Sequence, residues 1–264
     1  IPNSVTTIGD NAFRGCFNLS AVSIDVENSN LESIGEGAFM GAKALTEISI
    51  PKKVKTIGKN AFGTYKYNVG GVSVEAKCEK LKSVKFYEVK VGGTIEGAII
   101  DTIKEGTFEG SGLMSIDLPV YITTIEAAAF KNCKDLEKVN FQMGEFGRIA
   151  ELGIKKLGKN VFEGTSLKTV TIPRTIEEIS EYMFKDCKKL EKVEINELNR
   201  LPRKSITINQ GMFFGCTSLK EVKLPENNVG TLGVKLFEKS GLKKFVIPDG
   251  VITIEGEAFT GSSI

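Results

Sequence analysis

The chain has 264 residues, of which 41% are hydrophobic and 26% charged, so a folded core is expected and extensive disorder is not. Its 35 basic and 33 acidic residues leave a net charge of +2, which argues against nucleic acid or an anionic membrane as the main partner. The absence of histidine excludes Ser-His and Cys-His nucleophile pairs, histidine-ligated zinc and histidine acid–base catalysis within this chain. No apolar run approaches the roughly 18 residues that a membrane helix needs, so we expect no membrane insertion within this segment.

A repeated pattern begins at the first residue. Residues 1–24 read IPNSVTTIGDNAFRGCFNLSAVSI, and variants of this unit return at 50–65, 118–141, 172–195 and 247–259. One phenylalanine marks each copy, and these spine phenylalanines are Phe13, Phe39, Phe62, Phe108, Phe130, Phe162, Phe184, Phe213, Phe237 and Phe259. The shorter intervals between them are 22 to 24 residues, and the longer ones mark insertions. Both ends stop inside a repeat, so we expect a fragment or a mature segment of a longer chain.

Each unit divides into a strand, a stop and a turn. Apolar residues two apart, such as Ile48 and Ile50, have the period of a β-strand. The proline that follows, here Pro51, ends the strand because it lacks an amide donor. A second apolar pair, Val54 and Ile57 in this copy, closes the coil from the other side, and the A-F segment makes a turn or one helical turn.

Stacking of these units defines the expected fold, because no single unit can bury its phenylalanine alone. The pattern predicts one solenoid domain over residues 1–264 with about ten coils. We expect a parallel β-ladder on one face, and turns or short helical segments elsewhere.

The five cysteines share one position of the repeat: Cys16, Cys78, Cys133, Cys187 and Cys216. We interpret them as small buried thiols. Cys187 and Cys216 lie in consecutive coils and could be bridged. The other pairs would be separated by roughly 10 Å or more at strand spacing, beyond the ~7 Å between Cα atoms that a disulfide spans.

The motifs VTTIGDNAFRGCFNLSAVSI and VKTIGKNAF resemble the BspA-like leucine-rich repeats, a short phenylalanine-bearing class of surface proteins. The resemblance covers essentially the whole chain and implies a leucine-rich-repeat solenoid. It also implies a secreted or surface-attached protein, with an extracellular or cell-surface location and adhesion to host matrix or plasma proteins. Because the family has no shared catalytic residues, the resemblance implies no enzyme activity, and we expect no cofactor and no bound metal.

Insertions point to where a partner could bind. Four alternate coils carry long connections after the strand, in the intervals Ile24–Leu31, Phe86–Ile100, Phe141–Ile154 and Ile195–Ser205. All four leave the coil at the same point, so we expect them to project along one edge. A fifth insertion, between Phe62 and Cys78, leaves at a different corner.

Loops on a rigid scaffold often carry binding residues. The insertions contain Tyr65, Tyr67, Tyr87, Phe146 and Arg148, which are residue types enriched in interface hot spots. We take these five as candidate partner-binding residues. The alternative is that the loops pack on each other and cap the edge of the solenoid.

The outward side of the strands is the second candidate surface. Its residues are polar and mixed in sign: Ser23, Ser49, Lys85, Asp117, Asn140, Thr171, Glu194, Lys223 and Val246. This row spans roughly 430 Å², less than the ~800 Å² per partner of a standard interface, so a protein ligand would also need the insertion edge. Lys85 and Asn140 complete the candidate set.

We therefore expect a non-catalytic protein-binding scaffold whose partner is a protein or glycoprotein. One alternative is a spacer repeat that holds another domain. A remoter alternative is a carboxylate-based glycosidase that uses acids such as Glu177, Glu178, Glu191 and Glu194. Acids alternate with lysines in KKLEKVEINE, however, as they do on a solvated face.

Overall fold

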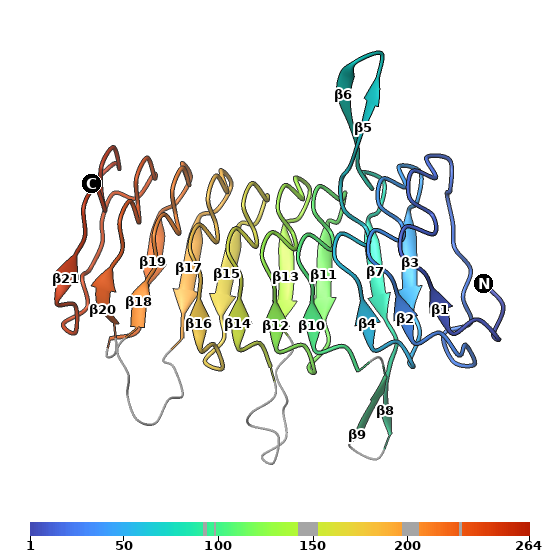
Figure 1. Cartoon of the computed structure of the whole chain (residues 1–264). Helices are drawn as coiled ribbons and strands as arrows, with labels where there is room; N and C mark the ends of the chain where they lie inside the picture. Colours follow the sequence, from blue (N-terminus) through green and yellow to red (C-terminus); the bar gives the residue numbers. More distant parts are fainter. Residues whose placement is uncertain (92–93, 98, 142–152, 197–205, 227–228) are drawn as a thin grey trace.

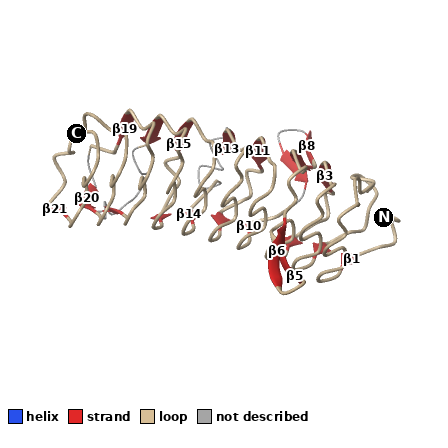
Figure 2. Cartoon of the chain, turned by 90° about the horizontal axis from the view of Figure 1, so that it is seen from above, coloured by secondary structure: helices blue, strands red, loops and turns tan. Residues whose placement is uncertain are grey.

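The computed structural model describes residues 1–91, 94–97, 99–141, 153–196, 206–226 and 229–264. The chain winds into a stack of coils along one axis, with the two termini at opposite ends (Figure 1). Its strands lie in two long rows, and two hairpins project from the stack (Figure 1). The predicted repeat solenoid is confirmed. Of the two forms predicted for the rest of each coil, turns or short helical segments, the structure has turns, and the regular elements of the described residues are strands alone (Figure 2).

The first row, called the strand face below, contains β3 (Glu47–Ile50), β7 (Ser83–Phe86), β11 (Ser115–Leu118), β13 (Lys138–Phe141), β15 (Thr169–Ile172), β17 (Lys192–Ile195) and β19 (Glu221–Lys223). These strands run parallel and pair in three groups: β3 with β7, β11 with β13, and β15 with β17 and β19. Alternate residues such as Ile48 and Ile50 are buried, as predicted. The strands expected at Ile24 and Phe245 do not form. Both segments lie in terminal coils of the described stack, which have a neighbouring coil on one side only.

A second row of short parallel strands lies opposite the strand face. It contains β1 (Thr7–Ile8), β2 (Ser33–Ile34), β4 (Thr56–Ile57), β10 (Thr102–Ile103), β12 (Thr124–Ile125), β14 (Lys156–Leu157), β16 (Glu178–Ile179), β18 (Ile206–Ile208), β20 (Val229–Leu232) and β21 (Thr253–Ile254). The sequence predicted apolar pairs here but no second ladder. Most of these strands have two residues, with one outward and one buried side chain, as in Thr56 and Ile57. Such a segment is too short to show strand periodicity.

The turn before each spine phenylalanine has a left-handed residue. The residue two positions before the ring has φ between 52° and 61° in all ten copies: Asn11, Gly37, Asn60, Gly106, Ala128, Asn160, Tyr182, Gly211, Lys235 and Glu257. A helical turn needs negative φ throughout, so the A-F segment forms a turn, one of the two forms that the sequence left open. From Phe13 to Phe237, the amide of each spine phenylalanine donates to a carbonyl of the next coil at 2.7–3.0 Å. The turns therefore form a third backbone ladder along the stack.

The ten spine phenylalanines line the core as predicted, and their rings form one continuous stack. Neighbouring ring centroids are 5.1–6.0 Å apart, and the ring planes differ by 2–21°. The eight inner rings are fully buried, whereas Phe13 and Phe259 at the ends are partly buried. Because full burial of one such side chain stabilises a fold by about 1.5–3 kcal/mol, this stack is the main apolar spine of the molecule.

Candidate functional site

The strand face presents the predicted outward residues in register. Ser49 pairs with Lys85, and Asp117 pairs with Asn140. Thr171, Glu194 and Lys223 follow one another on β15, β17 and β19. Side chains directly opposite each other on parallel strands lie on the same side of the sheet, so these residues share one solvent-facing surface.

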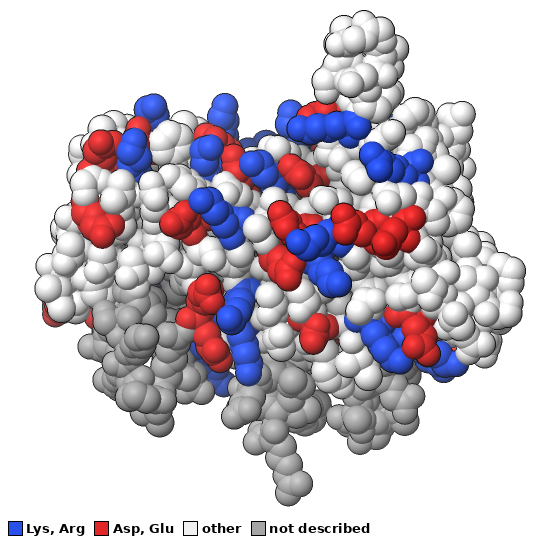
Figure 3. All heavy atoms as spheres, viewed as in Figure 1, with Lys and Arg blue, Asp and Glu red and all other residues white. Residues whose placement is uncertain are grey.

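Lys85 and Asn140 both interact with a neighbouring strand. The Lys85 Nζ atom lies 3.0 Å from the Glu47 carboxylate, and the Asn140 side-chain amide donates to Asp117. Farther along the face, Lys192 of β17 donates a hydrogen bond at 2.8 Å to the carboxylate of Glu221 on β19, and this carboxylate raises the pKa of the lysine. Acidic and basic side chains therefore alternate across the face, and Figure 3 shows the same mixture on the side of the molecule that it presents. Solvent-exposed pairs of this kind contribute little stability but set the polarity of the surface.

The insertion after Phe62 forms a projecting hairpin, called the ribbon below. It consists of β5 (Tyr65–Val69) and β6 (Val72–Ala76), which pair antiparallel. The turn residues Gly70 and Gly71 have φ of 57° and 83°. Two positive φ values in a two-residue loop are typical of the type I′ hairpin turn, whose twist matches that of the strands. The ribbon leaves the stack on the side opposite β8 (Glu88–Val91) and β9 (Thr94–Gly97), the hairpin of another insertion (Figure 1).

Tyr65 and Tyr67 hold the base of the ribbon against the first coils. Their rings stack with centroids 5.3 Å apart, and Tyr67 lies 5.4 Å from the ring of Phe17. The Arg14 guanidinium lies 4.4 Å from the centre of the Tyr65 ring. The structure thus brings these two predicted residues together, but in an internal aromatic cluster that leaves them half-buried. Arg14 and Phe17 were missed because nothing in the sequence near them points to contacts some 50 residues away.

The insertion after β7 forms a hairpin at the opposite edge. It consists of β8 (Glu88–Val91) and β9 (Thr94–Gly97), and Tyr87 lies half-buried just before it. Because the strands of the face are parallel, their carboxyl ends meet along this edge (Figure 1). The predicted residues Lys85 and Tyr87 therefore lie near the junction of the strand face and the insertion edge. Phe146 and Arg148, with the insertions that follow β13 and β17, lie outside the described residues.

The insertion after Ile24 is a compact turn. The Asp25 carboxylate accepts hydrogen bonds from the side chain of Asn28 and from the backbone amides of Glu27 and Asn28, and these bonds lower the pKa of Asp25. The Lys52 amide donates to the carbonyl of Val26 in the preceding coil. This insertion closes onto the stack, as the packing alternative predicts for such loops.

Four cysteines are buried free thiols, as predicted. The Sγ atoms of Cys78, Cys133, Cys187 and Cys216 each donate to the carbonyl of a spine phenylalanine in the preceding coil at 3.0–3.3 Å. Burial raises the pKa of Cys78, Cys133 and Cys187 to about 12. Cys187 and Cys216 are not bridged. Cys16 differs from the prediction: its thiol is exposed, and it lies in the first of the described coils.

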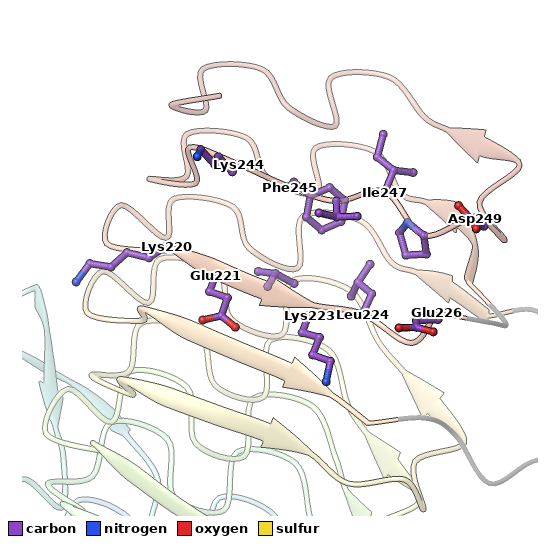
Figure 4. A pocket seen from close by; sticks show the side chains of 12 residues that line it. Lys220, Glu221, Lys223, Leu224, Glu226, Lys244, Phe245, Ile247 and Asp249 are labelled. Carbon is purple, nitrogen blue, oxygen red and sulfur yellow. The ribbon is translucent and has the colours of Figure 1, made fainter.

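Two grooves lie along the strand face. One of about 580 Å³ lies between β13 and β15 and includes Asn140 and Phe141. Another of about 720 Å³ separates β19 from the segment 244–249, whose Phe245 is among the side chains that line it (Figure 4). No group of three acidic or thiol side chains that could hold a metal ion was found over the residues described. No described helix is long and apolar enough to cross a membrane.

Three acids of the glycosidase alternative are ion-paired on open surface. Glu178, Glu191 and Glu194 lie 2.8–3.3 Å from lysines of the neighbouring coils. The side chains of these three glutamates are 59%, 50% and 32% exposed, respectively. These carboxylates are thus paired on the solvated face that the sequence indicated.

Comparison with known proteins identifies the repeat. The profile of the BspA type leucine rich repeat region (6 copies) matches residues 1–91, 94–152 and 148–264, nearly the whole chain. The chain belongs to this family. The predicted resemblance is therefore confirmed, and the Phe-centred coils described above are BspA-type leucine-rich repeats. No curated protein sequence matches the chain.

Solved structures of bacterial leucine-rich-repeat proteins share the fold of this BspA-type chain. A leucine-rich repeat protein from Bacteroides ovatus is 26% identical with a TM-score of 0.63, and the alignment covers 99% of this chain and 69% of that one. The pneumococcal vaccine antigen PcpA is 23% identical with a TM-score of 0.59, over 96% of this chain and 57% of the antigen. This chain thus spans little more than half the length of the pneumococcal protein.

Proposed function

We propose that this chain is a non-catalytic protein-binding module that acts outside the cell, secreted or attached to a cell surface. Its partner would be a protein or glycoprotein, such as a host matrix or plasma protein. The extracellular placement follows from the resemblance to BspA-like surface repeats. The observation that carries the binding role is the edge where the polar strand face meets the β8–β9 hairpin on a rigid stack of rings (Figure 1).

The proposed binding surface is centred on Lys85, Tyr87 and Asn140. Lys85 lies on β7 and Asn140 on β13, with Asp117 of β11 in the row between them. The three positions combine a cation, a phenol and an amide, so they can donate hydrogen bonds to carbonyl, carboxylate or sugar oxygens. The partners of Lys85 and Asn140, Glu47 and Asp117, are exposed groups whose interactions a ligand can replace at small cost.

A spacer that holds another domain is the second candidate, and one observation favours it. Tyr65 and Tyr67, the most conspicuous aromatic pair of the insertions, serve an internal contact with Phe17 and Arg14. Aromatic residues used for packing are expected in a structural repeat. The β8–β9 hairpin favours binding over this alternative, since a spacer would need only compact coils.

Binding of the purified chain to immobilised matrix and plasma glycoproteins and to intact cells tests the proposal. We expect saturable binding that is lost in the variant Lys85→Ala/Tyr87→Ala/Asn140→Ala. The matched control is Lys55→Ala/Lys156→Ala, which removes two exposed, ion-paired lysines beside the second row of strands. Binding should survive in the control.

Two outcomes would contradict the proposal. Absence of saturable binding by the well-folded chain would favour the spacer. Binding that is equally strong in the triple variant and the control would place the site away from the strand face.

A further inference from the structure

The outer half of the ribbon differs in chemistry from the rest of the surface. Residues 67–74 read YNVGGVSV and contain no charged residue and no proline. Val69 and Val72, which flank the turn, are 58% and 65% exposed. Charged side chains of both signs are scattered over the coils in Figure 3, whereas the projecting end of the ribbon shows none in the same view.

One face of the ribbon is apolar along its whole length. Residues directly opposite each other in an antiparallel pair lie on the same face. The pairs on this face are Tyr65 with Ala76, Tyr67 with Val74, and Val69 with Val72. The first coils cover the base of the face through Phe17 and Arg14, but the valine pair near the turn remains exposed.

The strand edges of the outer ribbon are open. β5 and β6 pair only with each other among the described strands. Native edge strands are usually protected by charged side chains, prolines or bulges. In the ribbon, Lys66, Glu75 and Lys77 form ion pairs near the base, and the outer half has no such protection.

Ser73 lies at the centre of this open edge. In a two-residue hairpin the residues that flank the turn, Val69 and Val72, form a hydrogen-bonded pair, and the next pair does not. Asn68 and Ser73 form that next pair, so the amide and carbonyl of Ser73 point away from β5. These groups are free to form a ladder with a further strand.

We propose that the ribbon is a self-association surface, in which β6 pairs antiparallel with β6 of a second copy around Ser73. In this register Val72 of each copy lies opposite Val74 of the other. The apolar faces of the two ribbons then lie on the same side of one four-stranded sheet and form a continuous apolar surface. Glu75 lies opposite Gly71 and therefore meets no like charge. Lys66 and Lys77 on the same ribbon already neutralise this carboxylate.

The second copy fits this surface because both sides are neutral and self-complementary. Two-fold pairing uses one patch twice, as most closed dimers do. The ribbon projects well clear of the coils, so two ribbons can meet without a clash between the stacks (Figure 1). A contact of this size is below the roughly 1,000 Å² of a stable interface, so the association is weak and reversible. If many copies were displayed side by side on a surface, their high local concentration would strengthen this weak association.

Sedimentation velocity across a concentration series tests the proposal. We expect the weight-average sedimentation coefficient to rise between about 5 and 500 µM, the range of a weak interface. Ser73→Pro should weaken the association at least about ten-fold, because proline removes the outward amide while the ladder of the hairpin stays intact. Val69→Thr/Val72→Thr should weaken it as well, since threonine keeps strand propensity and reduces apolar area.

The control variant changes two apolar side chains outside the ribbon that are even more exposed than its valines. Val246 and Ile252 in the last coils are 87% and 89% exposed. Val246→Thr/Ile252→Thr should leave the association unchanged. A monomer throughout the concentration series would overturn the proposal. So would an association that persists in Ser73→Pro or disappears in the control.

Discussion

The turn before each spine phenylalanine needs a left-handed residue. Glycine substitutions at two adjacent alanines of one such turn should therefore change the free energy of unfolding in opposite directions. Ala128 has a φ of 56°, and Ala127 is not among the residues with positive φ. Both side chains are half-buried. A left-handed alanine is strained by about 1–2 kcal/mol, and glycine is not, although glycine loses about 0.5–1 kcal/mol more backbone entropy on folding. Ala128→Gly should therefore raise the free energy of unfolding by about 0.5–1 kcal/mol, and Ala127→Gly should lower it by a similar amount.

Urea unfolding of the two variants beside the unmodified chain measures both changes. Comparable slopes against urea would show that the extent of unfolding is unchanged. Destabilisation of the chain by Ala128→Gly as large as that by Ala127→Gly would contradict this expectation. That result would mean that the turn does not need a left-handed residue at this position.

Three further predictions concern the core and the thiols. Phe130→Ala, in the middle of the ring stack, should lower the free energy of unfolding by about 3–5 kcal/mol, and Phe13→Ala at its half-buried end by about half as much or less, as measured by urea unfolding. A thiol reagent at mildly alkaline pH should label Cys16 promptly and the other four cysteines only after unfolding, as counted by mass spectrometry. Because burial raises the pKa of thiols such as Cys187 from 9.0 to about 12, unfolding releases protons between these pH values. The free energy of unfolding should then fall as the pH rises from 9 toward 12, and fall less in Cys187→Ala.

The core of the fold could be predicted because its signal repeats. One phenylalanine per coil fixed the register, and stacking of identical units made burial of these rings the simplest expectation. The turn conformation was also encoded, since Asn11, Gly37 and Asn60 precede the first three rings at the same spacing and are residue types that tolerate positive φ. In later coils Tyr182 and Lys235 occupy the same position with positive φ, so the residue type alone does not reveal the left-handed conformation.

The candidate site was harder to predict because it depends on tertiary contacts. Tyr65 and Tyr67 belong to types enriched in interfaces, but the same aromatic surface packs on Phe17 and under Arg14. Local sequence does not distinguish these two uses, because the partners come from a different coil. Lys85, by contrast, follows from strand alternation alone and lies on the outward face as predicted.

Amide hydrogen exchange of the free chain tests whether a rigid stack of phenylalanine-centred coils carries the proposed binding surfaces. The amides of the spine phenylalanines from Phe39 to Phe237 are buried and bonded to the next coil, so they should exchange most slowly. The amide of Ser73, at the open edge of the ribbon, should exchange quickly. If the spine amides exchanged as fast as Ser73, the coils would not form a continuous rigid stack and the account would be contradicted.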